Sequence, residues 1–406
     1  MYLIRQSGLP EIINENIDPL EYIDEDVMVE AKAKQVAELL QNSKHAVIYT
    51  GAGISTSAGI PDFRGPNGVW TQRETGAKID HFKPSPYLLP TIAHQAVKTL
   101  VELQMVKHVV STNCDGLHIK SGLNQNQLSE IHGNSYLEVC ADCGKNHWRD
   151  YAVRNNWSSH KHETGRKCES YRCEGNLLDT IVNFGEDELE GPWNQAVLNM
   201  NKADLVIVLG SSLRVRRSCE LPVMCLENEG SNLVIVNLQK TPSYDKAKLN
   251  VHCRTDDFMG LLFKYLELDI PSYVFDVTYE FGIEKVDDKS RIFVRECGQD
   301  KHIASVVDEV LFKVSLGALE LDHKMRSRWH ETEYQFLIDE PELVTKINVD
   351  LMMNFKEKEG VSNICSLEID PVPSPYFCVK FRIQRDSVTG EMTVERVEEG
   401  GFCSIC

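Results

Sequence analysis

The chain has 406 residues, of which 42% are hydrophobic, so it can bury a substantial core and has the length of two or three domains. This composition excludes a disordered or fibrous protein. The 61 acidic residues outnumber the 43 Lys and Arg residues, and the net charge of −18 argues against a broad DNA-binding face and favours basic partners.

Hydropathy and cysteine content indicate a protein that is neither membrane-bound nor secreted. The longest aliphatic run, Leu205–Leu209, is far shorter than the roughly 20 apolar residues of a membrane helix. The first residues, MYLIRQSG, lack the pattern of a signal peptide. Thirteen cysteines, four of them in two close pairs, indicate metal ligation and free thiols rather than disulfides. We therefore expect a cytosolic or nuclear protein without a transmembrane segment.

The amino-terminal part begins with an acidic segment. Residues 1–26 carry seven carboxylates against the single Arg5, which predicts a mostly solvated acidic leader. Apolar residues then recur with a period near 3.6 between Val27 and Gln41, which predicts a helix. The short apolar run Ala46–Tyr49 that follows predicts a buried strand.

Three further apolar runs have the length of buried strands, and the segments between them, such as Pro90–Met105, are long enough for crossover helices. These runs are His108–Val110, Leu205–Leu209 and Leu233–Val236. The pattern predicts a parallel α/β sheet. Each run ends in a small polar turn, and we expect the turns to converge, because ligands of open parallel sheets bind beyond the carboxyl ends of the strands.

The hydrophobic pattern changes to alternation in residues 271–406. Apolar residues occupy one face of Tyr273–Phe281, of Ile347–Phe355 and of Phe377–Ile383. Asp386–Gly390 has the composition of a hairpin turn. We predict a mostly antiparallel β-rich accessory domain of unknown role.

Residues 137–186 interrupt the strand and helix pattern with an insert rich in cysteine, histidine and charge. Its cysteines form two short hooks separated by 24 residues: Cys140 with Cys143, and Cys168 with Cys173. Two such hooks predict a closed, structural four-cysteine zinc site with no vacant position for water. Unpaired thiols or a redox pair are the alternative. Three histidines between the hooks are predicted to be surface residues: His147, His160 and His162.

The turn Gly51-Ala52-Gly53 directly follows the strand expected at Ala46–Tyr49, and a helix containing Gly59 is expected next. Glycines let a backbone approach a pyrophosphate, and free amides at a helix start face the anion. An ordinary tight turn is the alternative, because it needs glycine for its backbone whatever it binds. Asp62-Phe63-Arg64 then adds an acid, an aromatic ring and a guanidinium.

Five motifs, in order along the chain, resemble the sirtuin family of NAD-dependent protein deacylases. They are GAGISTSAGIPDFRG (51–65), TNCDGLH (112–118), EIHGN (130–134), NFGE (183–186) and GSSL (210–213). The resemblance covers about residues 27–272, and GIPDFRGPNGVWT (59–71) with NLQKTP (237–242) is most similar to class IV and its sirtuin-seven-like group. It implies a Rossmann-like NAD-binding domain over 27–136 and 187–270, and a zinc-binding insert with a substrate-pairing segment over 137–186.

The resemblance also implies site residues. His132 corresponds to the catalytic histidine, and Asn113 and Asp115 lie around the nicotinamide pocket, although a capped turn would favour the same two residue types. The other residues implied to bind NAD are Gly51, Ala52, Gly53, Ser55, Thr56, Asp62, Phe63, Arg64, Trp70, Thr112, Gly210, Ser211, Ser212, Asn237, Leu238, Gln239 and Thr255. Val182, Phe184 and Gly185 are implied to contact the acyl-lysine peptide.

The implied reaction begins with attack of the acyl-lysine carbonyl oxygen on the ribose carbon that bears nicotinamide. His132 then activates a ribose hydroxyl, which attacks the resulting imidate, and the products are nicotinamide, free lysine and O-acyl-ADP-ribose. Two departures bear on this reaction: Thr112 stands where most sirtuins have Gln, and Asn183 replaces a common hydrophobic residue. A protein mono-ADP-ribosyltransferase and an NAD-binding scaffold with weak turnover are the alternatives.

The resemblance further implies acyl-lysine substrates, in the first place histones or other Lys-rich nuclear proteins. It implies a nuclear location, with the cytoplasm as the alternative, and chromatin partners for the carboxyl-terminal domain. The final residues, Cys403-Ser404-Ile405-Cys406, fit a prenylation signal only loosely, because Ser404 is not aliphatic and acidic rather than basic residues precede it.

Overall fold

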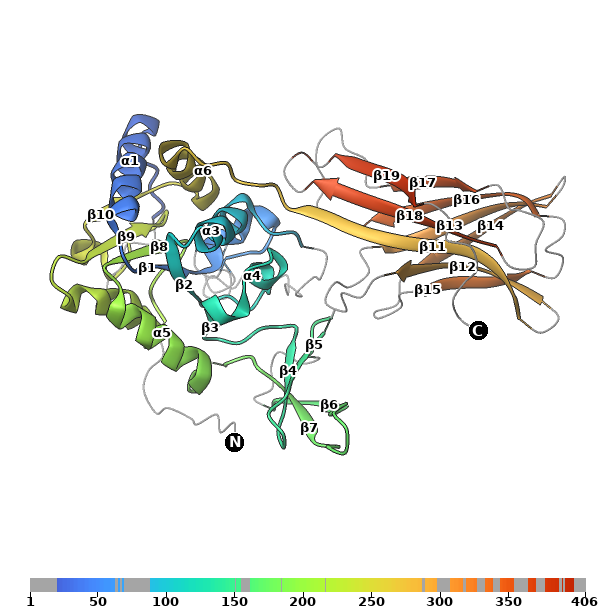
Figure 1. Cartoon of the computed structure of the whole chain (residues 1–406), viewed down its shortest axis with the longest axis horizontal. Helices are drawn as coiled ribbons and strands as arrows, with labels where there is room; N and C mark the ends of the chain where they lie inside the picture. The colour runs from blue at the N-terminus through green and yellow to red at the C-terminus, as the bar shows by residue number, and fades with distance from the viewer. Residues whose placement is uncertain are drawn as a thin grey trace. The chain divides into compact units, whose positions relative to one another are not determined.

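The computed structural model describes residues 20–62, 65, 68, 88–149, 151–154, 161–183, 185–215, 217–286, 289–297, 307–316, 319–326, 333–338, 344–353, 364–369, 377–386, 389 and 391–397. Most of the predicted acidic leader, and the chain end with Cys403, lie outside these ranges. The chain forms two compact units, and the first ends in sequence at Tyr273 (Figure 1). Among the described helices, none has the length and hydropathy needed to cross a membrane.

The first unit is built on a six-stranded parallel sheet with the order β10-β9-β8-β1-β2-β3. Its strands are β1 (Ala46–Thr50), β2 (Val106–Ser111), β3 (Leu128–Glu130), β8 (Leu205–Leu209), β9 (Asn232–Val236) and β10 (Leu249–Val251). The chain adds β2 and β3 on one side of β1, then β8, β9 and β10 on the other (Figure 1). This confirms the predicted parallel sheet. The short strands β3 and β10 had not been predicted, because three residues give no apolar run.

Helices cover both faces of this sheet, as expected for a Rossmann-like fold. On one face pack α1 (Asp26–Asn42), α3 (Ile92–Glu102) and α6 (Thr255–Leu266). On the other pack α5 (Glu190–Lys202) and the 3-10 helix η4 (Ser218–Glu227). Further short helices among the described residues are α4 (Leu117–Lys120), η3 (Gln125–Gln127) and η5 (Tyr244–Lys246).

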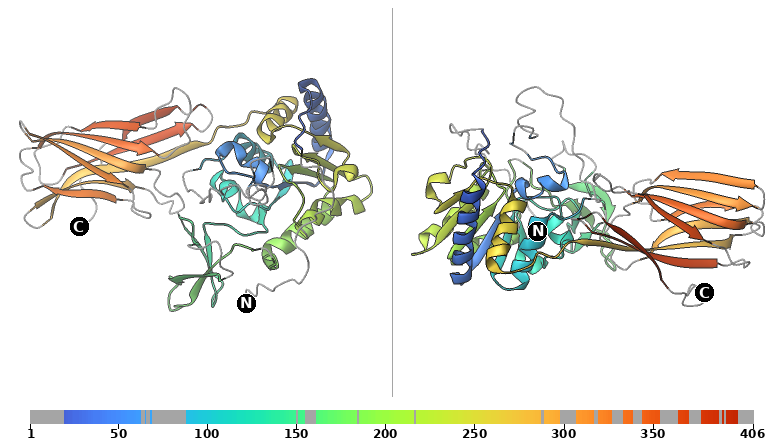
Figure 2. Two further views of the ribbon diagram at one scale, coloured as in Figure 1. Left: turned by 180° about the vertical axis from the view of Figure 1, so that it is seen from behind. Right: turned by 90° about the horizontal axis from the view of Figure 1, so that it is seen from above.

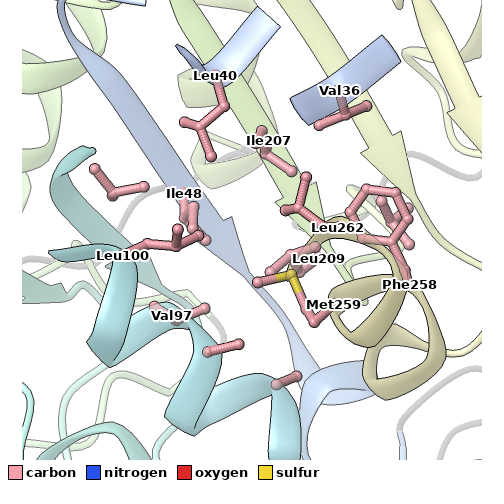
Figure 3. Close-up of a cluster of buried hydrophobic side chains, with 14 of the residues drawn as sticks. Val36, Leu40, Ile48, Val97, Leu100, Ile207, Leu209, Phe258, Met259 and Leu262 are labelled. Carbon is pink, nitrogen blue, oxygen red and sulfur yellow. The ribbon is translucent and has the colours of Figure 1, made fainter. Parts of the chain in front are cut away.

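Strand β1 shows why the apolar runs are uninterrupted. Ile48 lies in the cluster of α1, α3 and α6, which is drawn in Figure 3, whereas Val47 and Tyr49 lie in the cluster on the opposite face. Both faces of the strand are therefore buried, which favours an apolar residue at every position. Burial of each such side chain stabilises the fold by about 1.5–3 kcal/mol.

The predicted helix containing Gly59 is wrong. Residues after β1 form two single-turn 3-10 helices, η1 (Ala52–Ile54) and η2 (Thr56–Ala58). Gly59 ends the second one in the left-handed conformation, with φ of 95°. Glycine adopts this conformation without steric cost, and helices commonly end on such a residue.

The insert forms a separate four-stranded sheet with the order β5-β4-β7-β6. Its strands are β4 (Leu137–Cys140), β5 (Asn146–Trp148), β6 (Glu163–Lys167) and β7 (Asn176–Asp179). Strand β7 pairs antiparallel with both β4 and β6. The two cysteine hooks lie at the ends of these strands, so the sheet brings them together.

The second unit consists of two antiparallel sheets, with the orders β15-β12-β11-β18-β19 and β14-β13-β16-β17 (Figure 2). Its strands are β11 (Val274–Val286), β12 (Lys289–Cys297), β13 (Val307–Leu316), β14 (Leu319–Arg326), β15 (Glu333–Ile338), β16 (Val344–Met353), β17 (Ile364–Ile369), β18 (Phe377–Asp386) and β19 (Met392–Val397). Phe281 and Phe293 from one sheet and Phe312 and Val349 from the other line one small apolar cavity, so the two sheets face each other. This confirms the predicted antiparallel β architecture.

Candidate active site

The turns that follow neighbouring strands of the parallel sheet lie side by side at its carboxyl edge, joined by backbone hydrogen bonds. The amides involved are Gly51 (to Leu209 O, 3.1 Å), Gly210 (to Val236 O, 2.9 Å), Asn237 (to Val251 O, 3.1 Å) and Thr112 (to Thr50 O, 3.1 Å). The strand order reverses beside β1, and in sheets of this type ligands bind at that point. The structure therefore brings together the turns that the sequence placed around one ligand.

The two glycines of the first turn are in close contact with the turn after β8. Gly53 N donates to Gly210 O at 2.8 Å. A Cβ atom on Gly53 would lie 2.6 Å from Gly210 Cα, and one on Gly51 would lie 2.7 Å from Ser211 Cα. Glycine is thus required here by the crossing of two backbones, which gives the ordinary-turn interpretation a structural basis beside the nucleotide-binding one.

Polar side chains from the loops after β1 and β2 meet next to this crossing. Ser55 Oγ donates to Asp115 Oδ2 at 2.6 Å, and Asn113 Nδ2 donates to Gly51 O at 3.0 Å. Burial raises the pKa of Asp115. Asp115 Oδ1 also accepts from Leu117 N at 2.9 Å, so this carboxyl caps the short helix α4 as well. Asn113 and Asp115 are therefore held in fixed positions by the glycine turn and by α4.

His132 is half-buried in the loop after β3, and its Nδ1 lies 3.1 Å from the carbonyl oxygen of Thr112. A carbonyl can only accept, so Nδ1 carries the proton and Nε2 carries the lone pair. Burial lowers the pKa of His132 to about 4. The imidazole is therefore neutral at pH 7, the form that a general base requires.

Thr112 orients the histidine through its backbone. Its side-chain Oγ1 donates to Thr50 O at 3.1 Å, next to the backbone hydrogen bond between the same two residues. The hydroxyl thus holds the end of β2 against the end of β1. The departure from Gln at this position leaves the carbonyl contact with His132 intact.

The predicted substrate-pairing segment, which contains Val182 and Gly185, is hydrogen-bonded to the loop of His132. Val182 N donates to His132 O at 3.1 Å, and Asn134 N donates to Thr180 Oγ1 at 3.0 Å. Gly133 has a φ of 83° and lies so close to the backbone of Thr180 that a Cβ atom on Gly133 would be 1.9 Å from Thr180 O. Catalytic and substrate-pairing candidates therefore belong to one packed structure.

Several residues predicted to bind NAD lie just after β9 and at the start of α6. Thr255 Oγ1 donates to Gly53 O at 3.3 Å, and Asn237 Nδ2 donates to Gln239 O at 2.8 Å. Tyr22 N donates to Leu238 O at 2.9 Å, a contact that no sequence signal indicated.

The other predicted positions are distributed as follows. Ala52 and Thr56 lie in the two 3-10 helices with Gly53, and Asp62 accepts from Gly65 N at 2.7 Å. Ser212 follows Ser211 in the turn after β8, and Gly185 has a φ of 89° in the substrate-pairing segment. Four predicted site residues lie outside the described residues: Phe63, Arg64, Trp70 and Phe184.

The four predicted zinc ligands form a compact sulfur cluster. Their Sγ atoms all lie within 4.8 Å of one another, with 3.5 Å between Cys140 and Cys173 and 3.7 Å between Cys143 and Cys168. A tetrahedron with zinc–sulfur bonds of about 2.3 Å has edges of about 3.8 Å, so the cluster fits the ion. Four sulfur ligands would complete its coordination, which makes the site structural.

The predicted surface position is wrong for two of the three histidines in the insert. His147 is only 8% exposed, and its Nε2 lies 3.3 Å from Cys168 Sγ. The side chain of His162 is 12% exposed and lies between Asp179 and Glu186. His147 is buried and His162 is half-buried, and a sulfur or carboxylate acceptor contacts their ring nitrogens. His160 lies outside the described residues.

Comparison with known proteins identifies the family. The family model described as Sir2 family matches residues 77–217. The NAD-dependent protein deacetylase sirtuin-7 of Bos taurus is 43% identical over 261 residues, which are 62% of this chain and 64% of that protein. The NAD-dependent protein deacetylase Sirt6 of Drosophila melanogaster is 40% identical over 261 residues, covering 62% of this chain and 81% of the relative. The chain belongs to the Sir2 family.

The family assignment extends to distant members. The NAD-dependent protein deacetylase of Sulfolobus acidocaldarius is 32% identical over 252 residues, which are 58% of this chain and 96% of that protein. The match to sirtuin-7 confirms the resemblance predicted from the five motifs. The chain spans 64% of the length of the Bos taurus relative, so the Sir2 match concerns part of each protein.

Proposed function

We propose that this Sir2 family member is an NAD-dependent protein lysine deacylase that releases nicotinamide and O-acyl-ADP-ribose. The observation that carries the proposal is the geometry of His132, whose Nδ1 is bound to Thr112 O while Nε2 keeps its lone pair. The names of the relatives, which are NAD-dependent protein deacetylases, support the same reaction.

In this proposal NAD supplies the electrophilic ribose carbon and the hydroxyl that receives the acyl group. The backbone of the turns at Gly51–Gly53 and at Gly210 would lie against the phosphates, since glycines allow close backbone approach. Asn113 and Asp115, fixed by the glycine turn and by α4, would position the nicotinamide end. Nε2 of His132 would take the proton of the ribose hydroxyl as it attacks the acyl carbon.

The proposal also assigns the metal site and the domain limits. Cys140, Cys143, Cys168 and Cys173 would hold a structural zinc ion, which keeps the insert folded and takes no part in bond breaking. We propose the domain limits 27–136 with 187–270 for NAD, 137–186 for zinc and the peptide, and 271–406 for the accessory domain. That domain would bind protein partners, including chromatin proteins.

We further propose that the substrates are histones or other Lys-rich nuclear proteins carrying acyl-lysine, and that the protein acts in the nucleus. The net charge of −18 supports basic substrates, because opposite charge accelerates and strengthens their association.

The proposal is tested by incubating the protein with adenine-labelled NAD and acetyl-lysine histone peptides. The assay follows bound NAD, released nicotinamide, loss of the acetyl group, labelled O-acetyl-ADP-ribose and label attached to protein. Formation of labelled O-acetyl-ADP-ribose supports the deacylase. Labelled protein without acetyl loss would support mono-ADP-ribosyl transfer instead, and NAD binding without either product would support a scaffold.

A further inference from the structure

Five side chains form a closed ring next to the substrate-pairing segment. His162 Nδ1 lies 3.2 Å from Asp179 Oδ1, and its Nε2 lies 3.1 Å from Glu186 Oε1. Asn183 Nδ2 donates to Glu186 Oε2 at 2.7 Å. Arg154 closes the ring, because it donates to Asn183 Oδ1 at 2.8 Å and its Nε lies 3.7 Å from Asp179 Oδ2.

The ring requires a protonated His162. Both ring nitrogens face carboxylate oxygens, and only the imidazolium can donate from both. The surrounding charges agree with this. Within the ring, the two carboxylates Asp179 and Glu186 face the single guanidinium of Arg154, which leaves one negative charge that the imidazolium neutralises. Glu138, which is paired with Asp179 across strands β4 and β7, forms its own ion pair with Arg166.

The neighbours of His162 in the chain are Lys161 and Glu163, and both are exposed. The side chains of Asp179 and Glu186, in contrast, are 2% and 5% exposed, so water screens the contacts of His162 only weakly. Hydrogen bonds with Asp179 and Glu186 raise the pKa of His162 to about 9.

The ring fixes the backbone at Asn183 and Glu186. Glu186 Oε2 accepts from the backbone amide of Asn183 at 2.7 Å, and Glu186 N donates back to Asn183 O at 3.1 Å. Asp179 Oδ1 accepts from Ile181 N at 3.0 Å, just before the segment begins. At Val182 the segment is bound to His132 O. The ring thus completes a set of contacts that fixes this backbone on both sides.

We propose that His162 and Asn183 are positioning residues for the acyl-lysine peptide, because their ring holds the backbone at Val182, Asn183 and Glu186 as a rigid edge for the peptide and loosens it when His162 loses its proton. This inference rests on the proposed function. An extended peptide that pairs with a backbone edge gains affinity when that edge is ordered in advance. Asn183, which the sequence marked only as a departure from a hydrophobic residue, thereby acquires a specific role.

The test compares His162→Gln, Asn183→Ala and the double variant with the unchanged full chain. Glu163→Gln, an exposed neutralisation next to His162, is the matched control. Steady-state KM is measured separately for an acetyl-lysine peptide and for NAD. Each single variant is expected to raise the peptide KM by about tenfold, the effect of losing one charged hydrogen bond. The KM for NAD and the zinc content of the variants should stay unchanged. Glu163→Gln should have the same peptide KM as the unchanged protein.

Two further readouts separate positioning from a general structural role. The double variant is expected to raise the peptide KM no more than the larger single variant, because both changes open the same ring. With a peptide that has no titrating side chain, the unchanged protein should show a peptide KM that rises as the pH passes about 9, while His162→Gln lacks this step. The pH profile of the unchanged protein tests the ring even if a variant does not fold.

Three results would overturn the inference. They are an unchanged peptide KM in both single variants, equal increases in the KM values for peptide and NAD, and a flat pH profile of the unchanged protein up to about pH 10. Absence of NAD-dependent turnover in the unchanged protein would instead contradict the proposed function, and the inference with it. The two failures are therefore distinguishable.

Discussion

The backbone amide of Val182 donates to the carbonyl oxygen of His132 at 3.1 Å. The imidazole of the same histidine is held by Thr112 O, which lies at the end of β2. His132 therefore joins the sheet edge, where the turns proposed to bind NAD meet, to the segment proposed to bind the peptide. A shift of either part would move the base, so we expect peptide and nucleotide to be positioned together.

The assignment of the base predicts that His132→Asn is inactive but folded. The amide of Asn can still donate to Thr112 O, but it has no basic nitrogen. Loss of general-base catalysis is expected to lower kcat by about 100-fold or more. NAD affinity, measured by calorimetry, should change less than twofold. Near-normal kcat in this variant would remove His132 from the mechanism.

The crossing of two turns predicts a stability loss in Gly53→Ala. The new Cβ atom would lie 2.6 Å from Gly210 Cα, so one backbone must move, at a cost of about 1–3 kcal/mol in the free energy of unfolding. Gly260→Ala is the matched control, because no atom lies within 4 Å of its Cβ position in helix α6. Gly260→Ala should raise the free energy of unfolding above that of the unchanged protein by up to about 1 kcal/mol. Urea unfolding measures both, and equal effects of the two changes would refute the close contact.

The sulfur cluster predicts that zinc loss unfolds the insert locally. Cys168→Ser should lose zinc, and strands β4–β7 should then exchange their amide hydrogens faster while the parallel sheet keeps its protection. Cys114→Ser is the control, since its thiol lies outside the cluster and donates to His132 O. Full protection of the insert in the zinc-free variant would show that the metal has no structural role.

The contact of His147 with Cys168 predicts an effect on zinc retention alone. His147→Phe keeps an aromatic ring but removes the nitrogen that lies 3.3 Å from Cys168 Sγ. Loss of such an outer contact typically weakens metal binding by about 10–100-fold. Zinc release to a coloured chelator should therefore be faster than in the unchanged protein and in Lys145→Ala, an exposed control. Identical release rates in all three proteins would argue against this contact.

Four histidines whose pKa values are lowered predict a loss of stability in mild acid. Desolvation lowers the pKa of His108, His118 and His132 to about 4 each, and it lowers the pKa of His94 well below its ordinary value. The pKa of histidine in an unfolded chain is about 6.5. Between about pH 4 and this value, the unfolded chain therefore binds more protons than the folded one. This stabilisation is complete above about pH 6.5 and is lost as the pH falls towards about 4. Urea midpoints at about pH 7 and about pH 5 are compared between the unchanged protein and His118→Gln, and an equal pH dependence in both would contradict this contribution.

Sequence reasoning was most successful where the pattern is local. Strands β1 and β8 were predicted because burial on both faces gives uninterrupted apolar runs, whereas the three residues of β3 and β10 gave no such signal. The zinc cluster was predicted because each hook spans only a few residues.

Long-range polar contacts could not be predicted from the sequence. His162 pairs with Asp179 and Glu186, which lie 17 and 24 residues away in the chain, and nothing in the local pattern indicates which carboxylates it meets. The same reason explains the wrong surface assignment of His147. The helix around Gly59 was predicted from the usual strand, turn and helix order, but the left-handed conformation of this glycine ended a 3-10 helix instead.

The most direct test of the account is the product balance of a single reaction, measured by mass spectrometry with an acetyl-lysine peptide and NAD. We predict one nicotinamide and one O-acetyl-ADP-ribose for each lysine freed, and joint loss of all three products in His132→Asn. Release of free acetate with NAD unconsumed, or the same product balance and rate in the variant, would contradict the central claim.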